Sequence, residues 1–105
     1  MATGTVEDLS KIMEFPRRGV FSRVLVKSGA ANCTLMCLAR GSDISEHTST
    51  RDASVTVLKG EGTFVLGDRE IKLAPGVFIF MPAHTPHSLS ASDDLAILLS
   101  LYGKG

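Results

Sequence analysis

The sequence predicts an all-β fold of antiparallel strands, arranged as a sandwich or a barrel, and three observations lead to this prediction. Short apolar segments alternate with turn residues at intervals of roughly 8–12 residues. β-branched residues are common in these segments, as in 53–59. Only the N-terminal part carries a helix-start signal. A length of 105 residues suits one domain, so a single domain is expected over 1–105.

The expected elements follow one another between turn residues. Thr5-Val-Glu-Asp8 is typical of a capped start of one short helical turn, which ends near Met13 before Phe15-Pro16. Gly67-Asp68-Arg69 predicts a hairpin turn. Strands are expected at Val20–Lys27, Asn32–Ala39, Ile44–Ser49, Ala53–Lys59, Thr63–Leu66, Glu70–Leu73, Val77–Met81, His87–Ala91 and Leu95–Tyr102.

Charge and hydropathy narrow the classes of partner. Eleven basic and eleven acidic residues give a net charge of zero without a basic stripe, so no nucleic acid is expected as a partner. No apolar run has the length of a membrane span, so no membrane partner is expected either. A net charge near zero does little to oppose self-association, and a homodimer is expected.

The two cysteines indicate a reducing compartment. Cys33 and Cys37 lie four residues apart in a predicted strand, so both face the same side, about 13 Å apart. This distance is too long for a disulfide between them. We therefore expect reduced cysteines in a cytoplasmic protein.

Two glycine-bounded segments each deliver one histidine, about 40 residues apart. Gly41 is followed after five residues by His47, and Gly60 ends the next strand. Gly76 begins a strand that Pro82 ends, and a tight loop then leads to His87. In a small β-barrel both imidazoles can face one cavity, which predicts a metal site or a small-ligand site.

Strand alternation predicts which side chains surround these histidines. If His47 points inward, Ser49 does so as well, and His87 shares its face with Leu89. The predicted strand Ala53–Lys59 adds small apolar side chains to the wall of the cavity. The expected pocket consists of His47, Ser49, Ala53, Val55, His87 and Leu89, with Ala91 beside them.

The spacing of these motifs over residues 35–91 resembles the two motifs of the cupin superfamily, as a small single-domain cupin of the conserved-barrel type. The matching patterns are Gly41-x5-His47 through Gly60 and Gly76-x5-Pro82-x-His84-x2-His87. The resemblance implies an antiparallel double-stranded β-helix, the jelly roll, as a barrel of roughly six to eight strands. It also implies a frequent dimer and one divalent metal held by three histidines and a glutamate.

Carried over to this chain, the implied metal site is incomplete. His47 stands at the first histidine and His87 at the last, whereas Ser49 replaces the second histidine and Ala53 the glutamate. His84 occupies a position that is usually glycine and is a candidate third ligand. Two imidazoles would hold one divalent transition metal (Zn, Ni, Mn or Fe) only weakly, because such sites generally need three or four protein ligands.

Three functions stay open. The first is binding of a small molecule in the pocket, with a weakly held divalent metal at His47 and His87. The second is a metal-dependent enzyme of the dioxygenase or isomerase type acting on a small polar substrate. Around Ser49 no orienting group or oxyanion donors can be named, so catalysis itself stays open. The third is a scaffold that acts through its dimer surface.

Two aromatic residues carry a further expectation. Phe78 and Phe80 share one face of a predicted strand, and Met81 takes the other face. We expect this pair to pack in the core. The alternative is a dimer interface on an exposed sheet face, to which Tyr102 would also belong.

Overall fold

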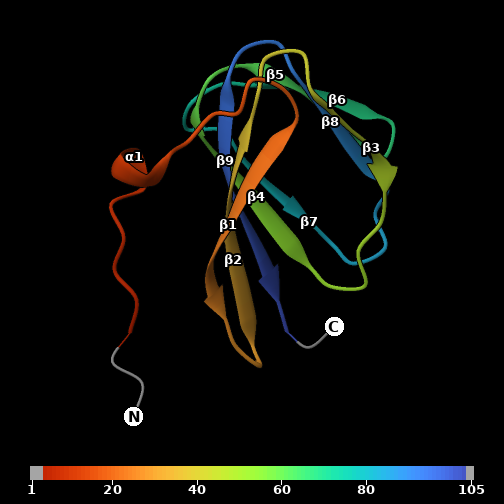
Figure 1. Cartoon of the computed structure of the whole chain (residues 1–105). Helices are drawn as coiled ribbons and strands as arrows, with labels where there is room; N and C mark the ends of the chain where they lie inside the picture. The colour runs from red at the N-terminus through yellow and green to blue at the C-terminus, as the bar shows by residue number, and fades with distance from the viewer. Residues whose placement is uncertain (1–3, 104–105) are drawn as a thin grey trace.

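The computed structural model describes residues 4–103, which form one short helix and nine strands (Figure 1). Within this range no helix is long and apolar enough to cross a membrane. The elements are α1 (Leu9–Ile12), β1 (Val20–Lys27), β2 (Ala31–Leu38), β3 (Asp43–His47), β4 (Ala53–Lys59), β5 (Gly62–Leu66), β6 (Arg69–Leu73), β7 (Phe78–Met81), β8 (His87–Ala91) and β9 (Leu95–Tyr102).

The strands form two antiparallel sheets that face each other. The first sheet has the order β1-β2-β9-β4-β7, and the second has the order β3-β8-β5-β6. Because strands that are distant in sequence lie side by side, as β2 does with β9, the chain folds as a jelly roll. The predicted jelly-roll fold class is therefore confirmed, although between residues 4 and 103 the two sheets do not join into one closed barrel.

Most element boundaries agree with the sequence prediction, and the differences lie at the ends of elements. β1, β4, β8 and β9 have the predicted bounds. The helix is shorter than expected: Asp8 is its N-cap, and its side chain accepts a hydrogen bond from the Ser10 amide at 3.1 Å. β3 ends at His47 instead of Ser49. The chain directly after His47 therefore belongs to a loop.

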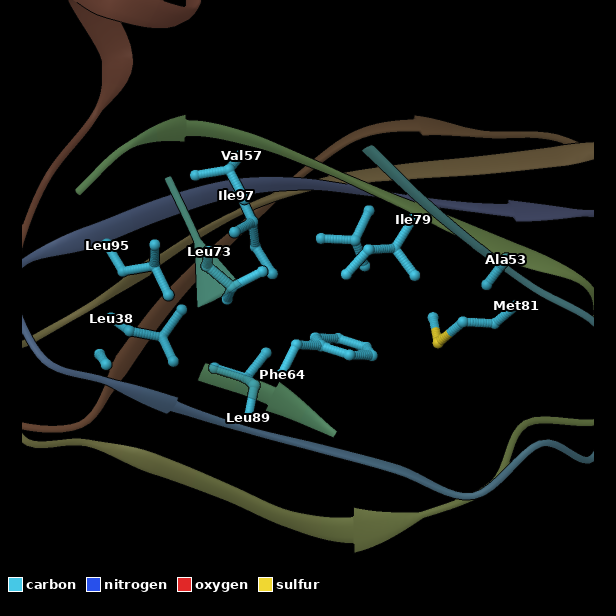
Figure 2. Packing of buried hydrophobic residues seen from close by; sticks show 12 residues of the cluster. Leu38, Ala53, Val57, Phe64, Leu73, Ile79, Met81, Leu89, Leu95 and Ile97 are labelled. Atoms are coloured by element: carbon cyan, nitrogen blue, oxygen red, sulfur yellow. The ribbon is translucent and has the colours of Figure 1, made fainter. Parts of the chain in front are cut away.

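The main hydrophobic core fills the space between the two sheets (Figure 2). Alternation along β4 places Ala53, Val55 and Val57 on the inner face, as the sequence predicts. Phe64 from the opposite sheet packs against them and is 1% exposed. Leu38, Leu73 and Leu95 gather at one end of this space, whereas Ala53 and Met81 lie toward the other end.

A second, smaller core lies on the outer face of the five-stranded sheet. Leu35 and Cys37 of β2 and Ala96 of β9 are fully buried there. The N-terminal segment covers them with Ile12, Met13 and Phe15. Both cysteines are free thiols, Cys37 buried and Cys33 half-buried.

The expectation that Phe78 and Phe80 pack in the core is wrong. Their exposed fractions are 62% and 49%, because Ile79 and Met81 occupy the inner face of β7. Tyr102 lies next to Phe80, with 6.5 Å between the ring centroids, and is also exposed. These three rings form an aromatic patch on the outer face of the first sheet.

Candidate functional site

The two motif histidines meet across neighbouring strands. β3 and β8 pair antiparallel, and His47 and His87 are register partners. Their ring centroids are 4.2 Å apart, with an interplanar angle of 60°. His87 is buried and stacks on Phe64, with 6.0 Å between centroids and 3° between ring planes. His47 is exposed. The pair thus has one buried inner member and one member open to solvent.

A β-bulge in β3 brings His47 to the cavity. Ile44 pairs with Leu89 and His47 pairs with His87, so β3 uses one residue more than β8 over this stretch. Simple alternation would place Ile44 and His47 on opposite faces, because they are an odd number of residues apart. The extra residue reverses the alternation, and both side chains line the same cavity.

Backbone carbonyls fix the orientation of both rings. The Nδ1–H of His47 donates to the Ser45 carbonyl oxygen at 2.8 Å, and that of His87 donates to the Thr85 carbonyl oxygen at 2.9 Å. A carbonyl oxygen only accepts, so this network assigns the proton of each neutral ring to Nδ1. The Nε2 lone pairs remain available as ligands or hydrogen-bond acceptors.

The histidine pair separates an inner cavity from a wider mouth. The inner cavity, about 100 Å³, is almost entirely apolar, and the mouth, about 480 Å³, is more polar. The inner cavity is lined by Met36, Ile44, His47, Val55, Phe64, Met81, His87, Ser88, Leu89, Ile97 and Leu99. The mouth is lined by His47, Thr48, Ser49, Thr50, Arg51, Ala53, Met81, His87, Leu99 and Leu101.

The structure places each residue of the expected pocket around these two spaces. Val55 and Leu89 line the inner cavity, Ser49 and Ala53 line the mouth, and the two histidines line both. Ala91, expected beside them, is buried in the core at 3% exposure and lines neither space.

His84 does not join the histidine pair. Its side chain is exposed and lines neither the cavity nor the mouth. Its φ of 67° lies in the left-handed region, which explains why glycine suits this motif position. Within residues 4–103, no group of three or more histidine, cysteine, aspartate or glutamate side chains is arranged to hold a metal ion.

Hydrogen bonds join the two loops that border the mouth. The His84 amide donates to the Ser49 carbonyl oxygen at 2.7 Å, and the Ala83 amide donates to the Asp52 carboxylate at 2.8 Å. Asp52 therefore reaches the opposite loop. These bonds fix the bend at 48–52 against the loop at 82–86.

Sequence reasoning missed Arg51, the only charged side chain among the residues that line the cavity and the mouth. It also missed Ile44, because the bulge is invisible to simple alternation. One signal could have pointed to Arg51, namely its place only four residues after His47 in the bend that leads into β4.

The family comparison agrees with this arrangement. Residues 34–102 match the family profile described as "Cupin domain". The chain belongs to the cupin family. Among curated proteins, none matches its sequence.

Solved structures support the same fold over most of the chain. A conserved protein of unknown function from Streptococcus pyogenes is 30% identical, with 100% of this chain and 92% of that chain covered and a TM-score of 0.86. A cupin superfamily protein from Desulfitobacterium hafniense is 25% identical, covering 91% and 88%, with a TM-score of 0.85. A salicylate 1,2-dioxygenase from Pseudoaminobacter salicylatoxidans is 19% identical, covering 80% and 26%, with a TM-score of 0.76. The last likeness shows the fold alone.

The donors present do not fit a tightly held metal ion. His47 and His87 supply two nitrogen ligands, and Ala53 stands where the family pattern implies a carboxylate. Tight transition-metal sites use three or four protein ligands. The pair can instead accept hydrogen bonds from a ligand through the two Nε2 atoms.

Proposed function

We propose that this cupin domain binds a small organic molecule in the inner cavity and mouth, beside His47 and His87. The observation that carries the proposal is the pair of imidazoles, held by backbone carbonyls at the junction of an apolar cavity and a more polar mouth. Such a concave, mostly apolar space with a few oriented polar groups is typical of small-molecule sites. A divalent ion would be held weakly at the two Nε2 atoms.

One observation keeps a second function open, a metal-dependent enzyme of the dioxygenase or isomerase type on a small polar substrate. Both Nδ1–H groups donate to backbone carbonyls, as metal-bound histidines commonly do. In that case the substrate would have to supply the ligands that Ser49 and Ala53 do not provide.

Elemental analysis of the purified protein and of the His47→Ala/His87→Ala variant distinguishes the two functions. For the binding function we expect much less than one metal per chain, even after incubation with iron, manganese, nickel or zinc. Near one metal per chain, lost in the variant, would contradict this expectation and put the enzyme first. A His84→Ala variant is the matched control, because its side chain lies outside the cavity and the mouth.

The aromatic patch supports a homodimer as part of the proposal. Phe78, Phe80 and Tyr102 expose large apolar area on one sheet face, as protein interfaces commonly do. The molar mass in solution tests this: Phe80→Ser should shift the protein to a monomer, and an unchanged mass would contradict it. The free thiols of Cys33 and Cys37 support the cytoplasm as the compartment.

A further inference from the structure

We infer that Arg51 makes the pocket selective for small monocarboxylic acids with a short apolar group. This inference rests on the proposed small-molecule function and names the class of ligand. The carboxylate would lie at Arg51 in the mouth, and the apolar group would pass the histidine pair into the inner cavity. Arg51 is thus a specificity-determining residue.

The side chain of Arg51 lines the mouth and reaches the inner face of the first sheet at Asn32. Asn32, Leu101 and Ala53 form one register row across β2, β9 and β4, so their side chains share a face. One Nη of Arg51 donates to the Oδ1 of Asn32 at 3.0 Å, with the Asn32 amide oriented to satisfy both of its groups. The other Nη donates to the Gly103 carbonyl oxygen. The guanidinium is therefore held in place beside Leu101, which also lines the mouth.

Arg51 is half-buried, and its guanidinium lacks two kinds of partner that such a cation commonly has. Its Nε atom is buried and has no hydrogen-bond acceptor among the described residues. Nearly all buried polar groups in proteins have a partner. The ion pairs found within residues 4–103 are Lys11–Asp8 and Arg23–Glu7, so no carboxylate there neutralises Arg51. The neighbouring Asp52 directs its carboxylate to the Ala83 amide instead.

These features select the charge of the ligand. Among residues 4–103 no carboxylate pairs with Arg51, and a positive charge without such a partner favours an anion, because hydrogen bonds between charged groups are the stronger ones. Among the described residues, Arg51 is the one cation that lines the cavity and the mouth, so a monoanion is neutralised there and a dianion is not. A carboxylate satisfies this condition near neutral pH, whereas phosphate carries more charge.

The inner cavity selects the remainder of the ligand. Its walls are aliphatic and aromatic side chains apart from the histidines and Ser88. Its volume of about 100 Å³ is smaller than the cavity of about 150 Å³ that holds benzene in a known case. A short branched alkyl group therefore suits it. Because His47, Met81, His87 and Leu99 line both spaces, such a group would pass between them.

The test compares isovalerate with isovaleramide, which has the same alkyl group and nearly the same shape but no charge. Binding to the full chain is measured by calorimetry and by amide chemical-shift changes, for the wild type and for Arg51→Gln. We expect the wild type to bind isovalerate at least tenfold more tightly than isovaleramide. In Arg51→Gln this preference should disappear while amide binding persists, which a merely structural role of Arg51 would not produce.

Controls separate the possible results. Arg18→Gln removes an exposed arginine outside the mouth and should keep the preference for the acid. Arg51→Lys keeps the positive charge but lacks the Nε–H group, and it should reduce the preference for the acid. If Arg51→Gln does not fold, the test uses Arg51→Lys. Inorganic phosphate should not displace isovalerate.

Each contrary result has its own meaning. Equal binding of acid and amide by the wild type would overturn the carboxylate class and leave the small-molecule function standing. A preference for the acid that survives in Arg51→Gln would overturn the role of Arg51. If neither isovalerate nor isovaleramide shifts the amides of residues 47–51 or 87–89, both this inference and the proposed pocket would be contradicted.

Discussion

The two ends of the space between the sheets share β9 but differ in packing. At the closed end, Leu38, Leu73 and Leu95 are completely buried (Figure 2). At the open end, the same face of β9 continues to Leu99, which is only partly buried and lines the cavity. The closed end therefore provides stability, and the open end leaves room for a ligand because large side chains no longer fill it.

The ends also differ in what holds the backbone. At the closed end, Gly60 lies so close to the Asp94 carbonyl that a Cβ atom there would overlap it. At the open end, side chains join the loops, as Asp52 does with the Ala83 amide. A substitution should therefore act mainly on stability at the closed end and mainly on ligand binding at the open end.

The largest effect is expected from Gly60→Ala at the closed end. The new methyl group would overlap the Asp94 carbonyl, and φ is +89°, so the free energy of unfolding should fall by about 4 kcal/mol or more. Gly41→Ala is the matched control, since φ is +85° but nothing lies within 4 Å of the added Cβ. It should cost only about 1 kcal/mol. Urea denaturation measures both, and equal losses would contradict tight closure at Gly60.

The same substitution on one strand compares the two ends directly. Leu95→Ala should lower the free energy of unfolding by about 3 kcal/mol, because Leu95 is fully buried among large side chains. Leu99→Ala should cost about 1 kcal/mol, because Leu99 already borders a cavity. Thermal or urea denaturation checks this. Similar costs for both leucines would show that the open end is packed as tightly as the closed end.

Restoring the family's ligand positions tests the geometry of the open end. Ser49→His together with Ala53→Glu should raise the affinity for Zn²⁺ or Ni²⁺ at least a hundredfold, about 2.7 kcal/mol, because four ligands would surround one ion. Calorimetry with each metal measures the gain in affinity. A triple variant that adds His47→Ala should lose most of this gain. No gain would mean that positions 49 and 53 do not face the histidine pair.

The smallest effect is expected at His84. Replacing it with glycine relieves a left-handed conformation but makes the unfolded chain more flexible, so His84→Gly should stabilise the protein by about 0.5 kcal/mol. Isovalerate binding should not change, because His84 lies outside the cavity and the mouth. The melting temperature and the calorimetric affinity together check this, and a loss of affinity would place His84 in the site.

Much of the fold could be predicted because its signals are local. β1, β4, β8 and β9 begin and end where turn residues and apolar alternation indicate. The faces of β4 follow from alternation alone. Phe78 and Phe80 could not be assigned this way, since alternation says that they share a face and not whether a second layer covers it.

The candidate site was predictable only in part. The glycine and histidine spacing indicates His47 and His87, because turn geometry fixes where each strand delivers its side chain. The bulge that places Ile44 and His47 on one face depends on how β3 pairs with β8. The position of His84 outside the pocket depends on how the loop at 82–86 bonds to the bend at 48–52. These are contacts between residues far apart in the chain.

By itself, the sequence determined an antiparallel all-β fold with two histidines at a shared cavity, because turns, alternation and spacing are properties of neighbouring residues. Its resemblance to the cupin motifs implied the jelly roll and the incomplete metal-ligand set. Only the tertiary structure decided that the cavity opens into a wider mouth and that Arg51 lines this mouth. Burial of the Arg51 Nε atom arises where β2, β9 and the bend before β4 meet. Burial and uncompensated charge depend on what surrounds a residue in space, which local sequence does not specify.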